Sequence, residues 1–280
     1  MEQCVVKRLQ GRDKSGAEVW SFRIPNSTND FIELSTYGCS LLGLYVHDRD
    51  GRLQNLVRGM GELAEYEGAG RSCASLLGGS PLAECLARKN WTVAEEGDNF
   101  VFLTAACTPE ESGLDGGVKV GARVMWVNLN RLVVDLYLTP ERGLDFRWGG
   151  QLTLREGAYQ IRSFCPQVAP DGGDPVPVEE TQYAEQQFAP LCGAVFCRPD
   201  EEIKPLAEVA EPATGMHLSV YGTSTCLRAA EGKVLQWCQG RLEAGESLAS
   251  RLIYGVDYLS PQPETEGEPN PFAAFGFGLT

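Results

Sequence analysis

The sequence is short of positive charge, of histidine and of long apolar runs, and each shortage argues against a class of protein. Its 24 Lys and Arg stand against 38 Asp and Glu, which leaves a formal net charge of −14. Nucleic acids and anionic membrane surfaces are bound by clustered cations that neutralise phosphates, so we expect neither as a partner. No apolar run reaches the roughly 18 residues of a membrane span, and residues 1–20 lack the apolar core of a signal peptide. We therefore expect a cytoplasmic protein.

Two histidines and ten dispersed cysteines offer little to a metal ion. The cysteines form no C-x-x-C pair, whereas zinc sites need Cys and His ligands at close spacing. We expect most of the cysteines to be small buried thiols, and all ten to stay reduced rather than form a disulfide framework. The glycine-rich stretch 78–81 lacks the lysine and the strand–loop–helix context of a phosphate-binding loop. The sequence thus predicts no metal, no nucleotide and no other cofactor.

What the sequence does contain is alternation of apolar and polar residues with a period of two, which is typical of half-buried strands. In residues 31–61 two alternating runs flank a bend at Gly38, and a turn follows at 48–51. The residues expected on one face of these runs are Ile32, Leu34, Leu42, Leu44 and Val46. Residues 132–138 alternate in the same way, whereas 62–67 suit a short helix. We predict an all-β, twisted antiparallel supersandwich, formed by one domain over residues 1–280.

Four segments carry further motifs. A tyrosine–glycine–cysteine triplet and an Asp-Arg-x-Gly turn lie within 37–66, and a strand, a glycine-rich turn and a long strand span 102–137. An acidic turn lies within 159–188, and a Leu-x-x-Gly-Glu turn lies within 213–254. In this order the segments resemble the aldose 1-epimerase (galactose mutarotase) family over nearly the whole chain. The resemblance implies the galactose mutarotase-like form of the supersandwich.

The same resemblance implies a catalytic pair that this sequence does not supply. Mutarotation needs a general acid and a general base, so that a sugar ring can open and reclose on its other face. In the family the acid is a histidine in a Thr-Asn-His-x-Tyr-Phe-Asn segment, and the base is a glutamate near the C-terminus. Here Gly149 stands at the approximate acid position and Gln236 at the approximate base position. His47 and His217 lie elsewhere, and we interpret both as residues of sheet surfaces.

The residues that remain around the expected pocket are polar and aromatic, which suits carbohydrate binding. The candidate sugar-binding residues are Arg147, Trp148, Gln151, Glu180 and Gln236. A tryptophan in the core with charges on a rim would fit the same residues.

Three functions stay open at this point. The first is a sugar-binding protein related to aldose 1-epimerase, with lost or strongly reduced epimerase activity. The second is an active aldose 1-epimerase that interconverts the α and β anomers of an aldose. The third is a non-enzymatic scaffold subunit. The partner in the first two is a small-molecule sugar, and the sequence gives no oligomeric state.

Overall fold

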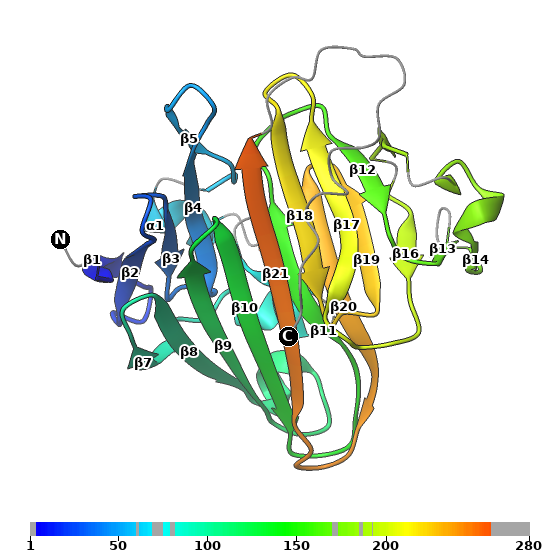
Figure 1. Cartoon of the computed structure of the whole chain (residues 1–280). Coiled ribbons are helices and arrows are strands. Elements are labelled where there is room, and N and C mark those ends of the chain that lie inside the picture. The colour runs from blue at the N-terminus through cyan, green and yellow to red at the C-terminus, as the bar shows by residue number, and fades with distance from the viewer. Residues whose placement is uncertain are drawn as a thin grey trace.

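The structure, a computed structural model, describes residues 4–59, 62–68, 75–78, 82–169, 173–184, 187–191 and 193–258. Within these residues the strands form three antiparallel sheets, and the helices are short pieces between them (Figure 1). The predicted all-β architecture is therefore confirmed. Residues 79–81 of the glycine-rich stretch, and the cysteines Cys73 and Cys192, lie outside the described residues.

The first sheet is a five-stranded meander at the N-terminal end of the chain. Its strands are β1 (Val6–Arg12), β2 (Glu18–Pro25), β3 (Phe31–Ser35), β4 (Ser40–His47) and β5 (Leu53–Asn55). The bend predicted at Gly38 has φ +67°, and the turn predicted at 48–51 ends in Gly51 with φ +74°. Both positions need glycine, because other side chains avoid positive φ. The two alternating runs form the antiparallel pair β3–β4 around the predicted bend, and β4 pairs with β5 across the predicted turn.

A bulge in this sheet changes one predicted face. Glu33 pairs with Gly43 but Leu34 pairs with Leu41, so β4 carries one extra residue at Leu42. Leu41 therefore joins Leu44 in the main core, whereas Leu42 packs against a small second cluster beside α1 (Leu63–Gly68). The expectation that Leu42 shares a face with Leu44 is wrong.

The second and third sheets are larger. The nine-stranded sheet has the order β15 (Ala189–Pro190), β12 (Gln160–Ser163), β17 (Lys204–Glu211), β18 (Met216–Gly222), β21 (Leu248–Tyr258), β10 (Arg131–Pro140), β9 (Val118–Val127), β8 (Phe100–Cys107) and β7 (Thr92–Glu96). The seven-stranded sheet has the order β14 (Val176–Pro177), β13 (Gln167–Ala169), β16 (Val195–Cys197), β19 (Cys226–Ala230), β20 (Lys233–Leu242), β11 (Leu144–Thr153) and β6 (Leu77–Gly78). The short helices are α1, α2 (Leu82–Leu86), α3 (Pro109–Ser112) and the 3₁₀ turn η2 (Val178–Glu180).

One apolar core joins the sheets. It contains Phe22 of the first sheet, Leu132 of the nine-stranded sheet and Trp148 of the seven-stranded sheet, all at most 1% exposed. Along β10 the alternate residues 132, 134, 136 and 138 are fully buried, as the sequence predicted. Each large sheet thus turns an inner face to the core and an outer face away from it.

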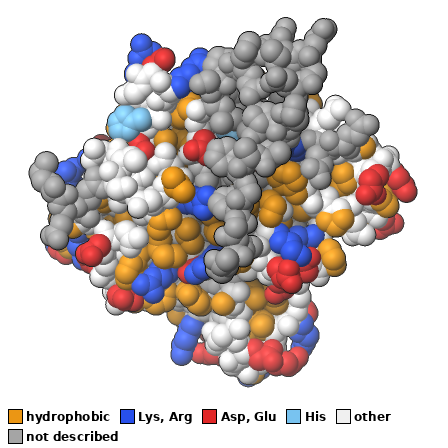
Figure 2. All heavy atoms as spheres, in the orientation of Figure 1, with side chains coloured by type: hydrophobic (Ala, Val, Ile, Leu, Met, Phe, Trp, Pro, Cys, Tyr) orange, Lys and Arg blue, Asp and Glu red, His pale blue; other side chains and the backbone are white. Residues whose placement is uncertain are grey.

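The distribution of charged side chains on the surface is consistent with the shortage of basic residues in the sequence. On the face drawn in Figure 2, basic and acidic side chains are interspersed, and the basic ones do not gather into a patch. Among the described residues, no helix combines the length and the apolar content needed to span a membrane.

Candidate functional site

The outer face of the seven-stranded sheet holds the position that the sequence assigned to the general acid. Along β11, Trp148 and Leu152 are buried in the core, whereas Arg147 is exposed and Gln151 is half-buried. This alternation is the ordinary consequence of the strand pleat. Gly149 therefore lies on the outer face, where it pairs with Trp237 of β20.

Two thiols and an indole form the centre of this face. Trp237 pairs with Cys226 of β19, and Cys226 pairs with Cys197 of β16, so the three side chains share one side of the sheet. The two sulfur atoms are 3.7 Å apart. The guanidinium of Arg147 lies 3.9 Å from the centroid of the Trp237 ring. We define the site face as Arg147, Gly149, Gln151, Cys197, Cys226 and Trp237.

The two thiols differ in acidity. The hydrogen bond between the thiols lowers the pKa of Cys197 and raises the pKa of Cys226, and burial raises the pKa of Cys226 further. Cys197 is thus the sulfur that ionises more easily. The site face, as defined, contains no histidine and no carboxylate.

Gly149 is closed to any side chain. A Cβ atom built there would lie 2.0 Å from the carbonyl oxygen of Gln236 and 2.5 Å from Cα of Trp237. Real Cβ atoms essentially never approach a neighbour below 3.0 Å, and here both neighbours are backbone, which cannot swing aside. A histidine at this position would need a different path for β20.

The five predicted site residues separate. Arg147 and Gln151 reach the site face, but Trp148 and Gln236 face the core, at 1% and 0% exposure. Glu180 is exposed in η2, just beyond the edge strand β14, and four strands lie between β14 and β11. The structure therefore brings two of the five together.

Gln236 has an unusual place for an amide. It lies in the core beside Tyr254 of β21, which is fully buried. Burial raises the pKa of Tyr254 well above its ordinary value, and the neighbouring amide of Gln236 offsets only part of that rise. Gln236 therefore cannot present a group to the outer face.

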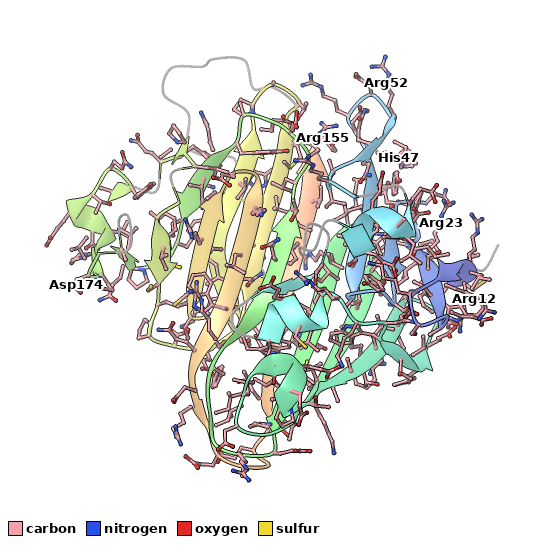
Figure 3. The ribbon with its side chains drawn as sticks, turned by 180° about the vertical axis from the view of Figure 1, so that it is seen from behind. Arg12, Arg23, His47, Arg52, Arg155 and Asp174 are labelled. Carbon is pink, nitrogen blue, oxygen red and sulfur yellow. The ribbon has the colours of Figure 1, made fainter. Side chains whose placement is uncertain are left out.

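A pocket adjoins the site face at the end of β11. Its volume is about 750 Å³, which suits a small-molecule ligand. The pocket is lined by residues of both charges and by a tyrosine, including Arg58, Thr153, Arg155, Glu156, Tyr159, Glu231 and Lys233. The Nε2 amide of Gln151 donates a 3.1 Å hydrogen bond to Oγ1 of Thr153, which links the site face to this end pocket. Figure 3 shows Arg155 at this end of the sandwich.

No protein-family model matches the sequence, and no curated protein matches it. Solved structures do match. The GalM/aldose epimerase homologue from C. elegans superposes with a TM-score of 0.72 at 12% identity, over 86% of this chain and 99% of that one. Galactose 1-epimerase from Lactobacillus acidophilus gives a TM-score of 0.72 at 12% identity, over 90% and 98%. A galactose mutarotase-like protein from Clostridium acetobutylicum gives 0.63 at 8% identity, over 91% and 99%.

The chain has the galactose mutarotase-like fold. At 8–12% identity, these likenesses establish the fold alone. They nevertheless agree with the family resemblance read from the order of the sequence motifs.

A second constellation on this mutarotase-like fold was not predicted from the sequence. On the outer face of the nine-stranded sheet, Nε2 of His217 lies 3.5 Å from Oε2 of Glu208, and Arg162 forms an ion pair with the same carboxylate. Asp257 of β21 is the register partner of His217. We call Arg162, Glu208, His217 and Asp257 the charged cluster. The side chains of its first three members are 6–12% exposed, so the prediction of a sheet-surface histidine holds for the strand but misses its burial.

The pKa values of the two carboxylates in the charged cluster are shifted in opposite directions. Burial raises the pKa of Glu208, but the neighbouring His217 and the hydrogen-bonded Arg162 outweigh it and leave the pKa below its ordinary value. Asp257 is an exposed residue near the end of β21, and desolvation by the surrounding protein still outweighs the attraction of His217 and Arg131 and raises its pKa. Opposite shifts of neighbouring acids are typical of acid–base sites, although buried ion-pair networks produce them too.

The other histidine lies at a hairpin. His47 ends β4, and its Nδ1 lies 2.6 Å from Oδ1 of the buried Asp30. The backbone N–H of His47 and the hydroxyl of Thr28 also donate to Asp30. These contacts satisfy a buried carboxylate, which gives His47 a structural task at the edge of the first sheet.

Proposed function

We propose that this chain binds a carbohydrate between the site face and the end pocket, and that it does not catalyse anomer exchange. The fold supports the first part, since two of the similar structures are named as an aldose epimerase homologue and as a galactose 1-epimerase. Closure of Gly149 to side chains carries the second part. We further propose a single domain over residues 1–280 that acts in the cytoplasm without metal or cofactor.

The proposed contacts follow from the groups that remain. Arg147 supplies a guanidinium with several donors, and Gln151 supplies an amide that both donates and accepts. Sugar hydroxyls need both kinds of partner. Trp237 is only 2% exposed, with the Arg147 guanidinium over its ring, so its apolar surface becomes available to a sugar only when Arg147 moves aside. Lys233 and Tyr159 extend the polar lining into the end pocket.

The lack of catalysis follows from proton transfer. Ring opening must remove a proton from the anomeric hydroxyl while another proton reaches the ring oxygen, so two separate groups must converge on the sugar. The two thiols of the site face instead bond to one another across 3.7 Å. Each missing proton-transfer group typically lowers the rate by about 10² to 10⁴.

One observation favours the active-epimerase alternative. The charged cluster joins a histidine to two carboxylates of opposite pKa shift, as an acid–base site would. The side chains of Arg162, Glu208 and His217 are buried and leave little room for a sugar, which is why we place it second.

Ligand-induced thermal shift with mono- and disaccharides tests the binding proposal. A ligand that binds only the native state raises the free energy of unfolding, and with it the melting temperature. At a free ligand concentration of one hundred times Kd, the added free energy is about 2.7 kcal/mol. We expect a rise for at least one sugar, and a much smaller rise in the Arg147→Ala and Gln151→Ala variants. Arg241→Ala is the matched control, because Arg241 is an exposed arginine of β20 paired with Asp145 and Glu243, outside the site face. A panel without any shift would contradict sugar binding and favour the scaffold alternative.

A further inference from the structure

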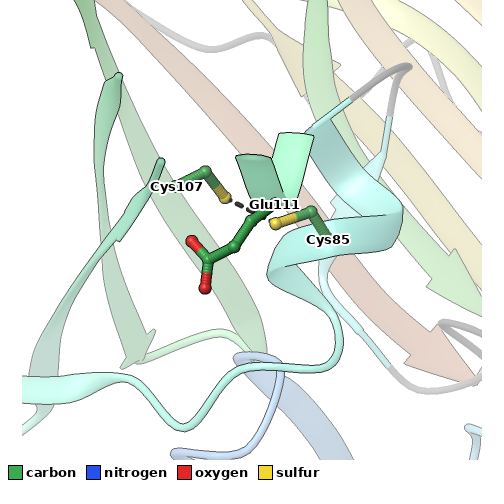
Figure 4. A group of neighbouring side chains, drawn as sticks. All are labelled: Cys85, Cys107 and Glu111. Carbon is green, nitrogen blue, oxygen red and sulfur yellow. Dashed lines mark hydrogen bonds between the residues drawn. The ribbon is translucent and has the colours of Figure 1, made fainter. Parts of the chain in front are cut away.

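Two cysteines outside the candidate site lie unusually close together. Cys85 is in α2 and Cys107 ends β8, and their sulfur atoms are 2.8 Å apart. Figure 4 shows the two sulfur atoms facing each other with Glu111 of α3 beside them. The pair thus joins two elements that are 22 residues apart in the sequence.

The surroundings of the pair favour a covalent bond over a metal ion. Two thiolates on one tetrahedral zinc ion, with Zn–S bonds near 2.3 Å, would be about 3.8 Å apart. The observed separation is well below that and closer to the roughly 2.05 Å of a disulfide. The Glu111 carboxylate is already held by Nζ of Lys89, at 2.7 Å from both oxygens, and by the backbone N–H of Thr108. The Lys89 ammonium would also repel a divalent cation.

The two thiols differ in their exposure to solvent. Cys85 is partly exposed, whereas Cys107 is only 2% exposed. Burial, together with the neighbouring Cys85, raises the pKa of Cys107 to about 12, so Cys107 carries its proton at neutral pH. An oxidant from solvent therefore meets Cys85 first.

We propose that Cys85 and Cys107 are an oxidation site that closes to a disulfide on reaction with hydrogen peroxide. The sulfur of Cys85 attacks one peroxide oxygen, the O–O bond breaks, and the departing oxygen takes up a proton and leaves as water. The sulfur of Cys107 then attacks the sulfenic acid of Cys85, and the S–O bond breaks. The hydroxyl leaves with the proton of Cys107 as a second water. In total, two thiols and one hydrogen peroxide give one disulfide and two waters.

The disulfide would clip α2 to the end of β8. In the sequence α2 follows shortly after β6, the strand that pairs with Gly149, so the clip lies on the chain segment that leads away from the site face. A cross-link lowers the conformational entropy of the unfolded chain. The oxidised protein should therefore have a melting temperature several degrees higher than the reduced protein. Oxidation at this pair does not depend on the proposed sugar binding.

Peptide mapping after treatment of the native, full-length protein with hydrogen peroxide tests the proposal. We expect a loss of two hydrogen atoms in intact mass and, without reductant, a link between tryptic peptides 72–88 and 90–119. The first peptide also contains Cys73, so Cys73→Ser is the matched control that keeps the link, whereas Cys85→Ser abolishes it. Dithiothreitol should reverse both the mass change and the rise in melting temperature.

Three results would overturn the proposal. One is over-oxidation of Cys85 to sulfinic acid without any linked peptide in the wild type. Another is a link that survives in Cys85→Ser and disappears in Cys73→Ser. The third is stoichiometric zinc in the purified protein that Cys85→Ser and Cys107→Ser both lose, because a metal site would then explain the pair. The wild-type peptide map shows whether the link forms even if a variant fails to fold.

Discussion

The outer faces of the two large sheets carry opposite kinds of chemistry. The nine-stranded sheet buries three of the four side chains of the charged cluster, and in it Arg162 and His217 both contact the carboxylate of Glu208. The site face of the seven-stranded sheet instead combines an indole, two thiols, an amide and a glycine, and its one charge, Arg147, is exposed above the buried Trp237 ring. The chain thus keeps groups able to move protons, but it keeps them across the sandwich from the site face.

The difference shows that a count of residue types does not locate a function. Two histidines in the sequence could have belonged to either face. Burial decides what each group can do, because a buried charge must be paired while an exposed one is solvated. The charged cluster is therefore expected to serve stability first, and the site face is free to bind a ligand at little cost to stability.

The largest expected effect is a difference in stability between a variant of the charged cluster and a variant of the site face. Arg162→Met removes one partner of a buried ion pair, and we expect a loss of about 3–5 kcal/mol in the free energy of unfolding. Arg147→Met, the matched change on the site face, removes an exposed guanidinium from the Trp237 ring and should cost at most about 1 kcal/mol. Urea denaturation of the two variants measures both values. Equal losses would mean that the two faces do not differ in the way described.

A smaller effect lies in the pH dependence of stability. The pKa of Glu208 is lowered on folding, so its contribution is present above the unfolded pKa and is lost as pH falls through the folded pKa. The pKa of Asp257 is raised, so its contribution is present below the unfolded pKa and is lost as pH rises through the folded pKa. Glu208→Gln should therefore flatten the acid limb of the stability curve, and Asp257→Asn should raise stability at neutral pH.

Urea midpoints between pH 3 and pH 8 would check this pair of predictions. Glu246→Gln is the control for the loss of one carboxylate, since Glu246 is exposed at the β20–β21 turn. An acid limb that is unchanged by Glu208→Gln would show that the charged cluster does not govern acid stability.

Much of the fold could be predicted from the sequence, because strand alternation and turn glycines act locally. The alternation along β10 and the turns at Gly38 and Gly51 appear where they were expected. The bulge at Leu42 could not be read from the period, since one inserted residue reverses the faces beyond it. The order of strands within the sheets could not be predicted either, because it depends on pairing between segments that are distant in the sequence.

The candidate site was harder to predict from the sequence than the fold. Adjacent residues of a strand face opposite sides, so Arg147 and Trp148 could not both line one face, and the alternation rule alone could have separated them. Trp237 was overlooked although it neighbours Gln236 in β20. The charged cluster needs four strands from residues 160–258 to meet, and its only local sign is that His217 falls out of phase with Leu218 and Val220.

Polarimetry measures whether the protein accelerates mutarotation, which we propose it does not. Freshly dissolved α-D-galactose and α-D-glucose should relax at the same rate with this protein as in buffer, while the galactose 1-epimerase from Lactobacillus acidophilus serves as the active control. An acceleration of about 10² or more, abolished in His217→Ala or Asp257→Asn, would contradict the proposed lack of catalysis and assign it to the charged cluster.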